Sequence, residues 1–255
     1  MNIRQCGQVL TGLIVLATAT GTVAADSSTS AGQAFGDKLV DLKSFVLQPG
    51  ETVARVNLAG GWFKDGTSET IAAPEIAIGL GRGFEFSVLG EYFIAADGAE
   101  GAESGLILPE LRYAPAAWGK VRWNPTFALG YEFVPEDADI FKLSLYLSDN
   151  IDTRWLWASN LTYQKRNGGD KELELIAKFG IHHVVAPNRL TVGAEFKFEH
   201  AKVYGDTPGT ARELLLGPAL IWRPTPKATL RAGSAFGVGG ESPKNESTVS
   251  FEWRF

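Results

Sequence analysis

Apolar and polar residues alternate with a period of two along most of the chain after residue 50. Successive side chains of a β-strand point to opposite faces, so this pattern predicts strands with one apolar and one polar face. The stretch 121–133 shows it most clearly, because seven apolar positions in succession alternate there with polar or small residues. The segments are about ten residues long, which is the length a tilted strand needs to cross a bilayer.

Twelve such segments follow one another and are joined by two kinds of connection. We predict strands over 52–63, 69–80, 84–93, 106–113, 121–133, 141–147, 154–164, 173–182, 190–199, 213–223, 229–236 and 248–255. Every second connection is short or turn-like, and the others are mostly longer, acidic and rich in glycine. The sequence therefore predicts an all-β protein, an up-and-down antiparallel transmembrane β-barrel of about twelve strands with the N and C termini in the periplasm.

A secreted soluble β-sandwich is the competing architecture, because its strands also alternate. The aromatic residues favour the barrel. They share the apolar face, and most lie toward strand ends, where the aromatic girdles of a membrane barrel would be. These residues are Trp62, Tyr92, Tyr113, Trp123, Tyr131, Trp155, Trp157, Tyr163, Trp222 and Trp253.

The chain before the first strand divides into two parts. Residues 1–25 are predicted to be a secretory signal peptide, with Arg4, a modest apolar run and small residues before Asp26. Residues 26–50 carry apolar side chains at helical spacing, which leaves two alternatives: a mobile periplasmic tail, or a short helix docked at or inside the barrel mouth. Residues 51–255 form the predicted transmembrane barrel.

The composition narrows the chemistry of the predicted mature chain. Cys6 leaves with the signal peptide, so neither a disulfide nor a thiolate metal site is expected. Removal of Arg4 leaves 23 basic against 29 acidic side chains, a net charge of 23 − 29 = −6. This balance argues against a nucleic-acid partner. We expect no cofactor; the expected partners are the bilayer of the outer membrane, the barrel-assembly machinery and a small-molecule solute.

The last eight residues alternate strictly and finish on an aromatic ring. Val249, Phe251, Trp253 and Phe255 share one face of the predicted strand. This ending resembles the C-terminal signal by which bacterial outer-membrane barrels are recognised for insertion. The resemblance implies that these four residues form an insertion signal and that the protein lies in the outer membrane.

Charged residues on the polar face of a membrane barrel would line its lumen. Since strand direction alternates, each charge can be assigned a height. Near the periplasmic ends we place Arg55, Arg112, Arg122, Arg154, Arg223, Arg231 and Arg254. Near the outer ends we place Glu69, Glu91, Glu132, Glu174, Glu199 and Glu213. The pattern predicts a glutamate-lined outer mouth above an arginine-rich base.

Two interpretations of these charges remain open. They could pair across neighbouring strands inside a narrow, filled barrel, because buried charges need compensation. They could instead line a water-filled path whose charge rings select solutes. Twelve strands lie between closed eight-stranded barrels and open sixteen-stranded porins, so the strand number does not decide.

Enzymatic activity is the hypothesis from another class, and the histidines argue against it. His182 is expected to point inward and His183 outward beside it, while His200 lies near the end of its strand. We find neither a nucleophile beside an activating base nor an Asp/His cluster at the mouth. We therefore predict no enzyme, no catalytic residue and no metal site.

The stretch 216–233 reads LGPALIWRPTPKATLRAG, with a Gly-Pro at the start of a strand and a polar turn after it. Together with Gly237 and Ser242-Pro243 it resembles the last hairpin of small outer-membrane barrels grouped with the MetA pathway of phenol degradation. The resemblance implies a passive channel or transporter for small solutes, hydrophobic compounds among them. A closed barrel with a structural or adaptor role is the alternative.

Overall fold

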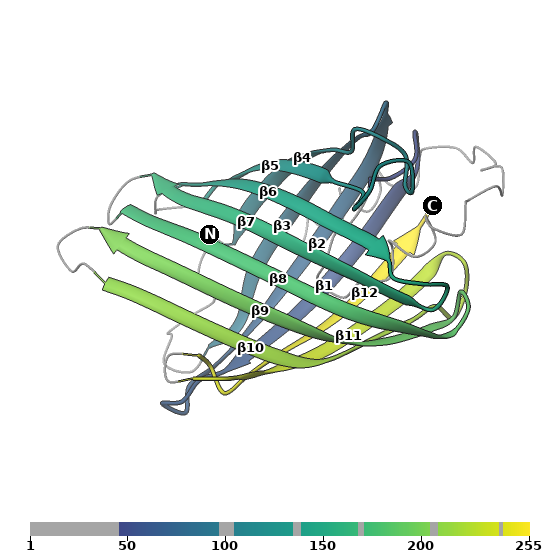
Figure 1. The fold of residues 1–255 in the computed structure, drawn as a ribbon. Helices are drawn as coiled ribbons and strands as arrows, with labels where there is room; N and C mark the ends of the chain where they lie inside the picture. The colour runs from purple at the N-terminus through teal and green to yellow at the C-terminus, as the bar shows by residue number, and fades with distance from the viewer. Residues whose placement is uncertain (1–45, 97–104, 135–138, 168–170, 205–208, 240–241) are drawn as a thin grey trace.

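Twelve antiparallel strands close into one barrel in the computed structural model, which describes residues 46–96, 105–134, 139–167, 171–204, 209–239 and 242–255 (Figure 1). The strands are β1 (Thr52–Trp62), β2 (Ser68–Gly81), β3 (Phe84–Ala96), β4 (Leu106–Tyr113), β5 (Thr126–Glu132), β6 (Asp139–Asn150), β7 (Trp155–Asn167), β8 (Lys171–Ala186), β9 (Leu190–Tyr204), β10 (Gly209–Trp222), β11 (Ala228–Gly237) and β12 (Asn245–Arg254). Each strand pairs with its neighbours in sequence, and β12 pairs with β1. The predicted all-β, up-and-down barrel is confirmed.

Several expectations fall outside the described residues. The signal peptide and most of the segment 26–50 belong to them, and the periplasmic position of the termini stays a prediction. Within the described ranges, no helix has the length and apolar character needed to span a membrane.

The seam between β1 and β12 closes the barrel in a continuous register. Val56 lies opposite Phe251 and Leu58 opposite Val249, so apolar residues meet on one face of the seam. Beyond the last paired residue, the backbone N–H of Phe255 donates to the carbonyl oxygen of Thr52 at 3.1 Å. The predicted insertion-signal residues therefore belong to the strand that completes the barrel.

The outer face of the barrel is apolar and carries aromatic rings at both ends. At the end with the short turns, exposed rings belong to Phe84, Tyr113, Trp123, Trp155, Trp222, Trp253 and Phe255. At the opposite end they belong to Trp62, Tyr131, Phe133, Tyr204 and Phe236. A soluble sandwich would bury such residues, whereas a bilayer accepts them and places aromatic rings at its two interfaces. The sandwich alternative was wrong.

The fifth strand is shorter than its sequence pattern predicts. We expected it over 121–133, but β5 begins at Thr126. Residues Trp123 and Asn124 have φ angles of 68° and 42°, in a left-handed conformation that no strand adopts. The Asn124 side chain stabilises this bend, since its amide nitrogen donates to the carbonyl of Ser148 at 2.9 Å and its oxygen accepts from the N–H of Gly119 at 2.5 Å.

Candidate functional site: the barrel lumen

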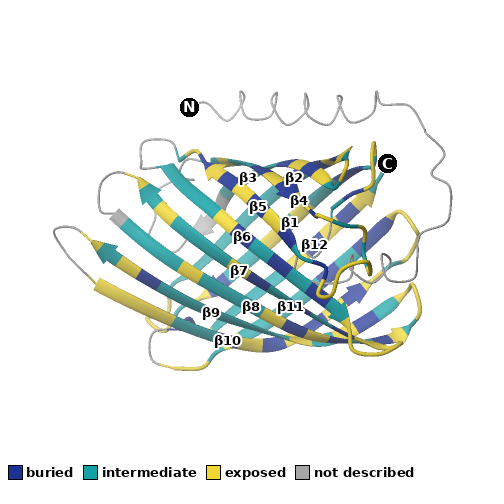
Figure 2. Cartoon of the chain, turned by 45° about the horizontal axis from the view of Figure 1, so that its top comes forward, coloured by how far each residue is buried: buried dark blue, intermediate teal, exposed yellow. Residues whose placement is uncertain are grey.

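The lumen has two halves with different solvent access. We call the end with the short turns the turn end and the other the loop end. Inward side chains near the turn end are buried: Ile221 and Glu252 are 1% exposed and His182 is 0% exposed. Most inward side chains nearer the loop end are partly exposed, although Glu132 and Leu215 are buried, and Figure 2 shows more of the buried residues toward the turn end. We call the half of the lumen nearer the loop end the cup and the half near the turn end the packed layer.

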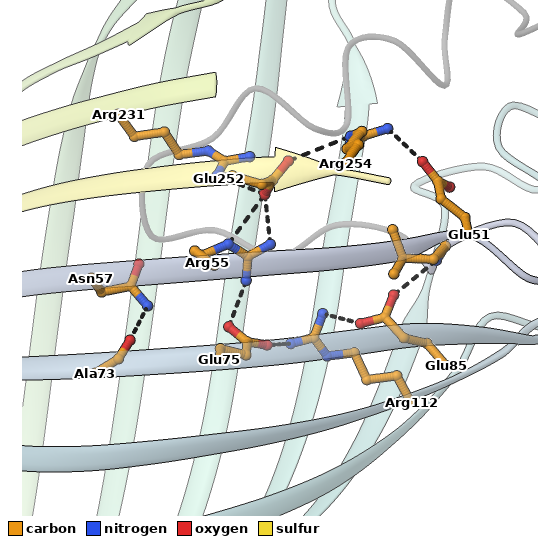
Figure 3. A network of polar contacts seen from close by, with 11 residues as sticks. Glu51, Arg55, Asn57, Ala73, Glu75, Glu85, Arg112, Arg231, Glu252 and Arg254 are labelled. Carbon is orange, nitrogen blue, oxygen red and sulfur yellow. Dashed lines mark hydrogen bonds and ion pairs between the residues drawn. The ribbon is translucent and has the colours of Figure 1, made fainter. Parts of the chain in front are cut away.

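Arg55 of β1 joins two neighbouring strands in the packed layer (Figure 3). Its guanidinium group lies 2.6 Å from the carboxylate of Glu75 on β2 and 2.7 Å from that of Glu252 on β12. Glu252 also accepts a 2.9 Å hydrogen bond from Arg231 of β11. Strands β11, β12, β1 and β2 are thus connected by charge across the closing seam.

Arg112 of β4 is a second centre of the same layer. It contacts Glu110 at 2.5 Å, Glu85 at 3.0 Å and Glu75 at 3.7 Å. Its guanidinium carbon lies 5.6 Å from the ring centre of Tyr146, whose hydroxyl donates to Glu110 at 3.4 Å. Because Glu75 contacts both Arg112 and Arg55, the two centres form one network.

The predicted arginine-rich base is balanced by carboxylates. Glu75 and Glu110 lie on the polar faces of their strands, but sequence reasoning did not assign them to the base. Arg254 likewise meets Glu51 at 2.9 Å. At this end of the barrel, arginine and glutamate side chains of neighbouring strands pair, as the first of the two interpretations proposed. Buried ions need such close partners because they have lost their contacts with water.

Residues 47–51, which we call the strap, cross the inner face of β2 in the packed layer. Leu47 is buried with Val53 and Ala77, and its N–H donates to the Glu85 carboxylate at 2.8 Å. The strap lies so close to Gly79 that a Cβ atom there would be 1.9 Å from the carbonyl oxygen of Gln48. A glycine at this position makes the contact possible. Residues 47–50, at the C-terminal end of the segment 26–50, therefore lie inside the barrel.

Two of the predicted lumen arginines lie elsewhere. Arg122 and Arg154 are exposed in the connections before β5 and β7. Arg122 lies over the ring of Trp123 at 5.1 Å, outside any strand, because the chain bends before β5 begins. Both residues lie in connections and not on the inward face of a strand, where the sequence pattern had placed them. Whether the other predicted residues line a conducting path stays a prediction.

The cup is lined mainly by carboxylates grouped around lysines. The Lys197 ammonium lies 3.0 Å from Glu199, 3.3 Å from Glu246 and 4.0 Å from Glu213. Sequence reasoning did not include Glu246 in this mouth, although it lies on the polar face of β12. Elsewhere in the cup Lys142 pairs with Glu132, and Gln164 donates to Glu174 at 2.8 Å.

A small cavity lies among inward residues of β8 to β12. It has a volume of about 50 Å³ and is lined by Lys178, Glu195, Lys197 and Glu246, with Gly217 and Gly233 among its other lining residues. A space of this size has room for a few water molecules.

The adjacent histidines His182 and His183 of β8 point to opposite faces of the sheet. His182 is buried with its Nε2 atom 3.2 Å from Glu195, and His183 packs on the outside with its ring 4.6 Å from Trp155. Among the described residues, no group of three or more His, Cys, Asp and Glu side chains could hold a metal ion.

The closed sheet, apolar exterior and charged lumen define an outer-membrane β-barrel. No family model and no curated protein matches the sequence. An outer-membrane channel from Pseudomonas putida F1 has a TM-score of 0.64 at 10% identity, covering 83% of this chain and 98% of that chain. The NanC porin has a TM-score of 0.55 at 12% identity, covering 80% and 100%.

The same fold also occurs in a protein of another kind. The β domain of the Bordetella autotransporter BrkA has a TM-score of 0.54 at 10% identity, covering 82% of this chain and 100% of that domain. At these identities the likenesses show the fold, and function has to be argued from the lumen.

Replacing Arg112 by Met tests the packed layer. The change leaves Glu85 and Glu110 buried without this guanidinium group, so we expect a loss of about 3–5 kcal/mol in the free energy of unfolding. Urea unfolding of the barrel refolded into lipid vesicles measures it. The matched control is Arg189→Met in the exposed turn between β8 and β9, with an expected change within about 0.5 kcal/mol. Equal losses in both variants would contradict the network.

Proposed function

We propose that this chain is an outer-membrane channel for small polar solutes, with a preference for cations. The observation that carries the proposal is the water-accessible, carboxylate-lined cup around Lys197. A ring of acidic side chains favours cations in a pore, because the local field raises their concentration. Solutes would enter from the loop end, where most inward residues are partly exposed.

The charged lining of the lumen favours polar solutes over apolar ones. The resemblance to phenol-pathway barrels implies hydrophobic compounds among the solutes, and that family assignment stays a prediction. An apolar solute would have to strip water from Lys197 and its carboxylate partners without replacing the lost hydrogen bonds. Small hydrated ions and polar molecules fit this lining better.

The packed layer would be the barrier to passage. Its side chains are buried, and the strap covers β2 from inside. Conduction through the turn end would therefore require the strap or the network to move. This feature also supports a second candidate, a closed barrel with a structural or adaptor role.

Planar-bilayer recording of the refolded protein separates the two candidates. We expect discrete current steps of small amplitude, because the charges of the cup are partly exposed while the packed layer is buried. We also propose that the outer membrane and the barrel-assembly machinery are partners of this protein. Protein that this machinery has inserted in cells therefore provides a second preparation, independent of refolding. Silence at every voltage in both preparations would exclude the channel and favour the closed barrel.

Gly79→Ala tests the strap. The added Cβ atom would lie 1.9 Å from the Gln48 carbonyl, so the strap must leave its position. We expect larger or more frequent current steps than in the wild type. Gly61→Ala is the matched control, since the side chains of Glu69 and Phe63 around its Cβ atom would lie 3.5 Å away, at ordinary van der Waals distance. Identical currents in wild type and Gly79→Ala would show that the strap is not the barrier.

Lys197→Gln tests the cup. The substitution removes the positive charge among Glu199, Glu213 and Glu246, so we expect a higher cation-to-anion permeability ratio. Reversal potentials in a salt gradient measure this ratio. Lys227→Gln, in the exposed turn before β11, should leave it unchanged. A ratio unaffected by Lys197→Gln would place the conducting path away from the cup.

A further inference from the structure

The outer wall of the barrel contains an apolar hollow near the turn end. It is shallow and open to the surroundings of the barrel, with a volume of about 460 Å³. Its lining residues come from β6, β7, β8 and two connections, and all are apolar. They are Trp123, Leu147, Ile151, Trp157, Phe179 and Ile181.

The hollow exists because β5 begins late while β6 continues to Asn150. The end of β6 pairs instead with the connection before β5: the N–H of Ser148 donates to the carbonyl of Trp123 at 2.8 Å. The N–H of Trp123 donates to the Asp149 carboxylate at 3.2 Å. These bonds fix Trp123 in its left-handed conformation, with φ of 68°, as one wall of the hollow. Backbone strain held in this way is typical of functional positions.

Basic side chains lie at the rim of the hollow. Arg122 precedes the wall residue Trp123, and Arg154 lies in the same tight turn as the lining residue Ile151. Both arginines are exposed, and neither forms an ion pair with another described residue in the structure.

The rim also contains two carboxylates, which are engaged by backbone donors. Asp152 accepts hydrogen bonds from the N–H groups of Arg154 and Trp155, both at 2.7 Å, and these lower its pKa. Asp149 accepts from Trp123 and from Asn150. These bonds leave both carboxylates negatively charged and hold their oxygens against backbone N–H groups. The exposed guanidinium groups are therefore the rim side chains available to a phosphate.

We propose that the hollow binds an acyl chain of an anionic phospholipid whose phosphate lies between Arg122 and Arg154. The apolar lining matches the chain, and the two exposed guanidinium groups match the phosphate in charge. Trp155 and Trp123 place the rim at the level of an aromatic girdle, where head groups lie. The inference rests on the membrane location of the barrel and is independent of channel activity.

Lipid retention tests the site. The mature protein is reconstituted with phosphatidylglycerol or with phosphatidylcholine, extracted into detergent and examined by native mass spectrometry. We expect the wild type to keep one phosphatidylglycerol preferentially. Retention should fall about fivefold for each arginine removed in Arg122→Gln and Arg154→Gln.

A second variant tests the apolar part without changing charge. Leu147→Trp fills the hollow, so it should lower retention of both lipids. The matched controls are Trp222→Ala and Lys227→Gln at the β10–β11 turn, which should retain lipid as the wild type does. Equal phosphatidylglycerol retention in the wild type and the double arginine variant would overturn the proposal. The proposal would also be overturned if the wild type formed a lipid-free dimer and Leu147→Trp abolished that dimer. A second copy of the chain, and not a lipid, would then fill the hollow.

Discussion

The hydrocarbon interior of a membrane supplies no partner for a backbone N–H or C=O group, so a sheet that spans it must close on itself. In this chain closure is made by β12 and β1, and the bond from Phe255 to Thr52 extends the ladder to the turn end. Closure has a consequence for the interior. It brings Arg55 from the first strand to Glu252 from the last, so the packed layer can form only in the closed barrel.

Burial then divides the lumen. Near the turn end, side chains fill the space and exclude water, and charged groups such as Arg112 have opposite charges within contact distance, here Glu85 and Glu110. Nearer the loop end, water reaches the charged side chains, and its hydrogen bonds stabilise their charges. An excess of carboxylates around Lys197 is therefore tolerated in the cup, whereas the packed layer requires balance.

Alternation was sufficient to predict the strand number, the faces and most strand limits, because every strand meets the same two environments. It failed at 121–133, where Trp123 and Asn124 keep the alternation of residue types but bend away from the sheet. The bend depends on contacts to Ser148 and Gly119, which no local pattern reports. Partners such as Glu75 for Arg55 depend on register, which alternation alone does not determine.

The strap is attached to the packed layer at two points. The N–H of Leu47 is bonded to Glu85, and the carboxylate of Glu51 is paired with Arg254. Between these points the network runs through Arg112, Glu75, Arg55 and Glu252 (Figure 3). Displacing the strap would remove a partner from both ends of this chain of contacts. Because partly satisfied buried networks are costly, the arrangement favours a two-state opening of the turn end over gradual loosening.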